Sequence, residues 1–148
     1  TPTREPETIE DTTFETPPEQ SLPPTVVSCV SEGMTYYGVW YKEHYAEVTG
    51  GVIMVTPYQG DASSYAFTGD SVAVVSTRHW NYGIMDVYID GELREEVDLY
   101  SPQVKARDTV FSASGLGPGV HTIKLVCTGR KNKEASFPFI NLEALQVR

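Results

Sequence analysis

The stretch that decides the fold covers residues 83–126 and reads GIMDVYIDGELREEVDLYSPQVKARDTVFSASGLGPGVHTIKLV. Met85, Val87 and Ile89 fall on one face of an extended chain and Ile84, Asp86, Tyr88 and Asp90 on the other, which is the period of a strand with one buried face. Asp90 and Gly91 can then adopt the positive φ angles of a two-residue type I′ turn. Residues 92–97 are therefore expected to return as the partner strand of a β-hairpin.

The second part of this stretch predicts another pair of strands, Thr109–Ala113 and Val120–Val126. Their connection, SGLGPG at residues 114–119, holds three glycines and a proline. These residues disfavour a helix and favour a tight reversal of the chain. We therefore expect the two strands to pair with each other in an antiparallel hairpin.

The rest of the chain has short apolar runs and no long stretch of helical periodicity. The aromatic-rich segment at residues 31–49 is expected to be a loop. Two antiparallel sheets packed face to face suit this pattern, so the predicted fold class is an all-β antiparallel β-sandwich. Its remaining strands are expected at residues 25–30, 52–56, 65–67, 72–76 and 137–147.

Several motifs carry a family resemblance. They are the strand–DG–strand unit, VDLYS at 97–101, VFSASGLGPGVHTIKLVCTG at 110–129, YGVW at 37–40 and SYAFTGDSV at 64–72. Together they resemble a β-sandwich module appended to secreted bacterial glycoside hydrolases and carbohydrate esterases. The resemblance covers roughly residues 26–148. It implies a jelly roll of the galactose-binding-domain-like type, whose usual role is to bind carbohydrate.

Composition narrows the choice of partner. The chain has 148 residues, which suits one domain, and a formal net charge of −9. An acidic surface repels phosphate backbones and anionic membranes, so nucleic-acid binding is not expected. No apolar run approaches the length of a membrane span, so membrane insertion is not expected either. Neutral sugars are indifferent to the sign of the charge.

Residues 1–24 differ in composition from the rest. They are rich in Thr, Pro and Glu and nearly free of apolar side chains, which predicts an acidic linker or tail before a β-sandwich module at residues 25–148. The chain lacks an initiator Met, so we expect it to be part of a larger secreted or cell-surface protein. An ordered tail would instead indicate docking on a neighbouring copy.

Cys29 and Cys127 are the only cysteines, and each lies in an expected strand. The ends of a jelly roll commonly lie side by side, so a disulfide between them would close a long loop. Two separate buried thiols would fit the sequence equally well. The sequence leaves both alternatives open.

The loop Arg78-His79-Trp80-Asn81-Tyr82 is the strongest candidate for a ligand site. A neutral sugar needs an aromatic plate for its C–H face and planar donors and acceptors for its hydroxyls. Within five residues the loop offers both. The alternative is that Trp80 folds inward and caps the sandwich.

Tyr37 and Trp40 belong to a second aromatic cluster, and YGVW matches a motif of the resembling modules. Either ring could stack on a ligand. Because large aromatic side chains dominate core burial, we favour a core position for Trp40.

Glu143 lies where the closing strand of related jelly rolls often has a carboxylate that helps to hold a structural calcium. That resemblance implies a calcium site here, with loop carbonyls and a second acid such as Glu32.

No catalytic site is expected. Ser114 lies in a turn without a GxSxG elbow, and His44, His79 and His121 lack metal-ligand spacing.

The sequence thus predicts a non-catalytic carbohydrate-binding module, tethered to other domains of its parent chain, with a poly- or oligosaccharide as partner. The alternative is a structural subunit or adhesin repeat whose tail docks on a neighbouring copy.

Overall fold

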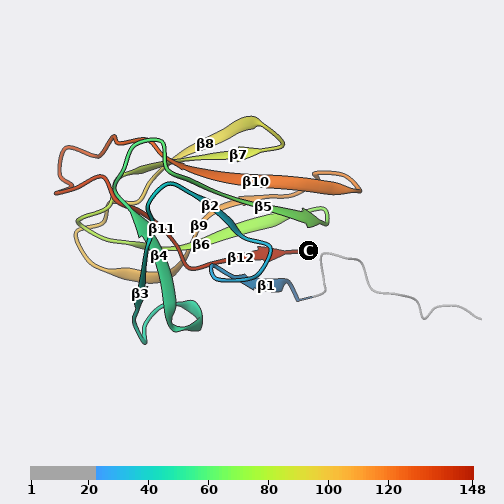
Figure 1. Cartoon of the computed structure of the whole chain (residues 1–148), viewed down its shortest axis with the longest axis horizontal. Helices are drawn as coiled ribbons and strands as arrows, with labels where there is room; N and C mark the ends of the chain where they lie inside the picture. The colour runs from blue at the N-terminus through green and yellow to red at the C-terminus, as the bar shows by residue number, and fades with distance from the viewer. Residues whose placement is uncertain (1–22) are drawn as a thin grey trace, which may run out of the picture.

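Antiparallel strands dominate the part of the chain that the computed structural model describes, residues 23–148. Twelve strands and one short 3-10 helix occur there, and all named strand pairs are antiparallel (Figure 1). The strands form three sheets. The first has the order β1 (Thr25–Ser28), β12 (Ala144–Val147), β6 (Val72–Arg78), β9 (Lys105–Ala113).

The other two sheets complete the architecture. The second has the order β2 (Thr35–Tyr37), β5 (Ala62–Thr68), β10 (Val120–Cys127), β7 (Ile84–Ile89), β8 (Glu92–Asp98). The third has the order β11 (Ile140–Leu142), β4 (Val52–Thr56), β3 (Tyr41–His44). The 3-10 helix η3 (Thr49–Gly51) leads into β4. In Figure 1 the third sheet lies at the end of the molecule away from the C-terminus.

The two larger sheets enclose one apolar core. Strand alternation turns Val74 of β6 and Leu145 of β12 inward, into the same buried cluster as Val87 of β7 and Leu125 of β10. Met54 of β4 joins this cluster, so the third sheet closes one end of the core. The predicted all-β antiparallel β-sandwich is confirmed.

The hairpin expected at residues 84–97 is also confirmed. β7 pairs with β8, and the inward side chains Met85, Val87 and Ile89 are buried. Asp90 and Gly91 have φ angles of 53° and 82°, the two positive values that a type I′ turn requires.

The prediction that residues 109–113 and 120–126 pair in a second hairpin is wrong. β9 pairs with β6, whereas β10 pairs with β5 and β7, so residues 114–119 cross from one sheet to the other. The carboxylate of Asp70 accepts the backbone N–H groups of Gly115 and Gly117 at 3.1 and 3.0 Å and holds this crossing. A glycine-rich connection fits an arch between sheets as well as a reversal within one, because both need positive φ angles.

Two other segments differ from expectation. The expected loop at residues 31–49 contains the short strands β2 and β3. The closing strand expected at residues 137–147 is divided into β11 and β12, with Glu143 between them. Asn141 and Glu143 are fully buried, and their side chains bond to the backbone or side chains of β6 residues, which interrupts the simple alternation.

Of the two alternatives left open for the cysteines, the structure has the separate thiols, because both cysteines are free and buried. The thiol of Cys29 approaches the carbonyl of Val52 at 3.6 Å, and that of Cys127 approaches the carbonyl of Thr56 at 3.9 Å. These carbonyls lie at opposite ends of β4, roughly 13 Å apart at the rise of an extended strand, whereas a disulfide needs Cα atoms within about 7 Å. Burial raises the pKa of Cys29 to about 11 and also raises that of Cys127.

The predictions for the tail lie outside the described residues, because residues 1–22 hold nearly all of it. The prediction that it docks on a neighbouring copy falls there too. Within residues 23–148, there is no helix with the length and apolar character needed to cross a membrane.

One ion pair links the turn of the first hairpin to β10. Asp90 Oδ2 lies 2.7 Å from Nδ1 of His121, and the other ring nitrogen lies 2.8 Å from the carbonyl oxygen of Gly117. Both ring nitrogens therefore face acceptors, an arrangement that favours imidazolium. The hydrogen bond to Asp90 raises the pKa of His121, and the same bond lowers the pKa of Asp90.

We expect Asp90→Asn to change the pH dependence of stability, since asparagine keeps the turn but loses the charge. A raised histidine pKa stabilises the fold below about pH 6.5, and this contribution disappears as the pH rises through the folded-state pKa. The Tm difference between the parent and D90N should thus be largest at about pH 5–6 and shrink above that. A difference that stays constant from about pH 5 to pH 9 would contradict the ion pair.

Candidate functional site

Three aromatic rings stack where β6 ends. The ring centroids of His79 and Trp80 lie 3.9 Å apart at an interplanar angle of 30°, and those of His79 and Tyr82 lie 4.9 Å apart. Trp80 is 45% exposed, whereas Tyr82 is buried. This aromatic stack (Trp80, His79, Tyr82) therefore runs from an exposed indole to a buried phenol.

Backbone hydrogen bonds fix the loop that carries the stack. His79 donates to the carbonyl of Leu99 at 3.0 Å, and the carbonyl of Trp80 accepts from Ser136 at 2.9 Å. The backbone N–H of Asn81 donates to Nδ1 of His79 at 3.0 Å. Since burial lowers the pKa of His79, the ring is neutral at pH 7, with its proton on Nε2.

The stack borders two adjoining hollows that share Tyr45, His79 and Tyr82 in their walls. The larger has a volume of about 530 Å³ and the smaller about 170 Å³. We call the two together the groove. The other residues that line it are Glu47, Val48, Ile53, Thr77, Val104 and Ala106 in the larger hollow and Glu43, Val55, Asn81 and Phe139 in the smaller.

The third sheet supplies the floor of the groove. Ile53 and Val55 of β4 pack with Val48 and Phe139 in a small apolar cluster separate from the main core. Glu43 of β3 pairs with Ile53, so its side chain stands on the same face. The sequence thus places an acid beside an apolar floor.

Tyr45 and Glu43 are held together. The Tyr45 hydroxyl donates to Glu43 Oε1 at 3.0 Å, and this bond raises the pKa of Tyr45. The phenol therefore stays protonated, and the bond orients both the ring and the carboxylate toward the groove.

The hydroxyl of Tyr82 has no hydrogen-bond partner among residues 23–148, although the residue is only 9% exposed. Burial is the main cause that raises its pKa, and the nearby Glu43, Tyr45 and Glu143 raise it further. The hydroxyl oxygen itself is not fully buried, so a water molecule or a ligand can reach it. It can donate to, and accept from, a group in the groove.

Glu143 joins three elements around the groove. One carboxylate oxygen accepts the backbone N–H of Thr49 at 2.8 Å. The other accepts the N–H of Arg107 at 3.0 Å and the hydroxyl of Thr77 at 2.5 Å. These residues belong to η3, β9 and β6, and Arg107 adopts a left-handed φ of 58° at this bond. Glu143 therefore fixes the walls of the groove relative to one another.

No protein-family model matches the chain. Two enzymes of Flavonifractor plautii are similar in sequence. The A type blood alpha-D-galactosamine galactosaminidase is 36% identical over 100 residues, which is 68% of this chain and 9% of that enzyme. The A type blood N-acetyl-alpha-D-galactosamine deacetylase is 31% identical over 94 residues, 64% of this chain and 12% of that enzyme. The chain thus spans about a tenth of each relative's length.

Solved structures share the fold at lower identity. A Paenibacillus xanthan lyase matches 88% of this chain and 14% of its own, with a TM-score of 0.62 and 19% identity. A two-domain esterase active on acetylated mannans matches 92% of this chain and 40% of its own, with a TM-score of 0.63 and 12% identity. The chain shares its β-sandwich fold with parts of these enzymes. The fold implied by the resemblance of its motifs is therefore confirmed.

Of the predicted ligand residues of this module, His79, Asn81 and Tyr82 line the groove, and Trp80 stacks on His79 at its edge. Arg78 is engaged elsewhere. Its Nε lies 2.7 Å from Asp108 Oδ2, and it also donates to the carbonyl of Asp98 at 2.7 Å.

Trp40 and Tyr37 of the module do not line the groove. The indole N–H of Trp40 lies 3.1 Å from the carbonyl oxygens of Tyr37 and Ala62, and its ring meets Tyr36 edge-on at 4.9 Å. Trp40 packs against the main core, in keeping with the position favoured from its sequence. Tyr37 is exposed, but it is not brought together with the aromatic stack.

The residues around Glu143 do not fit a calcium ion. Both carboxylate oxygens face N–H or O–H donors, whose hydrogens repel a cation. Glu32 is exposed and forms no bond with Glu143. Within residues 23–148, no three acidic, histidine or cysteine side chains come together as a metal site.

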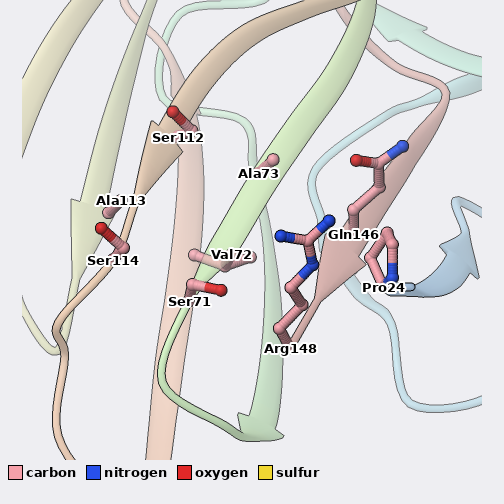
Figure 2. A pocket seen from close by; sticks show the side chains of 9 residues that line it. All are labelled: Pro24, Ser71, Val72, Ala73, Ser112, Ala113, Ser114, Gln146 and Arg148. Atoms are coloured by element: carbon pink, nitrogen blue, oxygen red, sulfur yellow. The ribbon is translucent and has the colours of Figure 1, made fainter. Parts of the chain in front are cut away.

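A second hollow of the module, of about 250 Å³, lies on the outer face of the first sheet (Figure 2). Ala73 pairs with Gln146 on one side and with Ser112 on the other, so these three side chains share the outer face of the sheet. No aromatic side chain lines this hollow, so it offers no stacking surface to a sugar ring.

Sequence reasoning missed three residues of the groove, Glu43, Glu47 and Tyr45. The alternation in Tyr41-Lys-Glu43-His-Tyr45 could have shown a strand with tyrosine and glutamate on one face. Nothing local indicated that this strand lies beside the loop at residues 78–82, which is more than thirty positions away.

Proposed function

We propose that this module binds carbohydrate in the groove and catalyses no reaction on it. The observation that carries the proposal is an exposed indole stacked beside a hollow that is lined by Tyr82, whose hydroxyl has no hydrogen-bond partner among residues 23–148. A sugar ring can lay its C–H face on Trp80. Its hydroxyls can then bond to the phenol of Tyr82 and to Asn81.

The sequence relatives support a carbohydrate as the ligand. Their names describe enzymes that act on galactosamine and on N-acetylgalactosamine of A type blood. We take the module to be part of a secreted or cell-surface protein and to hold its other domains near a glycan. Single-site affinity would be modest, so several modules or a dense glycan would strengthen attachment.

The groove also favours binding over catalysis. The carboxylate of Glu43 accepts the Tyr45 hydroxyl, and Nδ1 of His79 accepts the Asn81 N–H. Glu43 and His79 are therefore engaged in holding the walls in place, whereas Glu47, the other acid of the lining, forms no bond with residues 23–148. Incubation with a bound glycan should return it unchanged, and turnover would contradict this part of the proposal.

A pair of tyrosine variants tests the site. A glycan array selects a ligand, and calorimetry then compares the parent with Tyr82→Phe. Because the Tyr82 hydroxyl makes no intramolecular bond, its loss should lower affinity about fivefold to tenfold, the worth of a neutral hydrogen bond, and leave Tm unchanged.

Tyr36→Phe is the matched control, because its hydroxyl donates to the carbonyl of Cys29, away from the groove. Its loss should lower Tm while affinity stays at the parent value. An array that is blank, or a Y82F variant that binds as tightly as the parent, would overturn the proposed site.

A further inference from the structure

We infer that the groove selects amino sugars with a free, protonated amine over their neutral and N-acetylated counterparts. This inference rests on the proposed function and names its ligand class. It starts from the charges of the lining residues. Glu43 and Glu47 are acidic, His79 is neutral, and neither lysine nor arginine lines either hollow.

The two carboxylates are not neutralised by the protein. Neither takes part in an ion pair with any of residues 23–148. The guanidinium of Arg107 donates to the carbonyl of Ala46, the residue before Glu47, at 3.4 Å, but Arg107 does not line the groove. Arg78 is paired with Asp108. The lining of the groove therefore carries two carboxylates and no cationic side chain.

The shape of the site adds a second, independent argument. The Tyr82 hydroxyl has no hydrogen-bond partner among residues 23–148 and is accessible, and Tyr45 and Tyr82 line the same space. An ammonium group donates three hydrogen bonds, which carboxylates and phenols can accept. Aromatic faces attract the same cation. An acetamido group brings no charge to these partners, so N-acetylation removes the attraction.

The test compares three sugars that differ only at one position: D-galactosamine, D-galactose and N-acetyl-D-galactosamine, with the gluco-configured trio in parallel. Calorimetry at about neutral pH should show the free amine bound about tenfold more tightly than its neutral and acetylated partners, the worth of one charge-assisted bond. Raising the salt to about 0.5 M should shrink that preference and leave galactose binding unchanged.

Three glutamine variants locate the effect. Glu43→Gln and Glu47→Gln should each reduce the ratio of free-amine to neutral-sugar affinity severalfold. Glu95→Gln, an exposed acid of β8 far from the groove, should keep the full preference.

The outcomes separate the two claims. Equal binding of free-amine and neutral sugars in both trios overturns the inference alone, as does an undiminished preference in E43Q and E47Q. A chain that binds no sugar of either trio and none on the array overturns the proposed function, and the inference with it.

Discussion

Replacing Trp80 with alanine should nearly abolish glycan binding and leave the fold intact. The indole is 45% exposed, rests on His79 at 3.9 Å and forms the open end of the aromatic stack. Losing a central aromatic anchor typically costs about 2 kcal/mol or more, which is at least about thirtyfold in affinity. Tm should change little, because an exposed ring removes little apolar surface from water.

Trp40→Ala is the control for this prediction, since its ring packs on the main core and its N–H bonds to the backbone. We expect it to lose about 3 kcal/mol of stability. If Trp80→Ala unfolds the module instead, or binds the array-selected glycan as well as the parent does, the stacking role is wrong.

The second large effect is expected at Glu143. Glu143→Ala would leave three donors without an acceptor, the N–H groups of Thr49 and Arg107 and the hydroxyl of Thr77. An unsatisfied buried donor costs about 1–3 kcal/mol. Only the bond of Thr77 is fully buried and the other two are half-buried, so urea unfolding should show a loss of about 3–5 kcal/mol. The left-handed Arg107 also loses the bond that accompanies its φ of 58°.

Glu32→Ala is the matched control, because this exposed acid has no contact with the groove and should change stability by less than about 0.5 kcal/mol. Treatment with a chelator tests whether the Glu143 carboxylate only accepts hydrogen bonds or also binds calcium. EDTA should leave the parent unchanged if the carboxylate is satisfied by donors. A stability loss with EDTA as large as that of E143A would show that Glu143 holds a cation.

Local patterns predicted the fold well where neighbouring residues determine it. The alternation at residues 84–89 and the Asp90-Gly91 turn specify a hairpin without help from the rest of the chain. The local pattern gave the wrong pairing at residues 114–119, because a glycine-rich connection can form either a hairpin turn within one sheet or a crossing between two sheets. Which one forms depends on Asp70, forty-five residues before Gly115, whose carboxylate holds the crossing.

The candidate site was predictable in part for the same reason. Its stacking loop is contiguous, so the composition of residues 78–82 pointed to it. Its other wall comes from β3, and its rigidity comes from Glu143, sixty-six residues from Thr77. Long-range contacts of this kind leave no local pattern, and they also turned Arg78 away from the groove toward Asp108.

The most direct test of the account is an amide NMR titration of the 15N-labelled chain with the glycan chosen by the array. Binding in the groove predicts that the largest shifts fall at Tyr45, at residues 79–82 and at residues 104–106. Shifts confined to the hollow of Figure 2 or to Tyr37, with the groove amides unmoved at saturation, would contradict it.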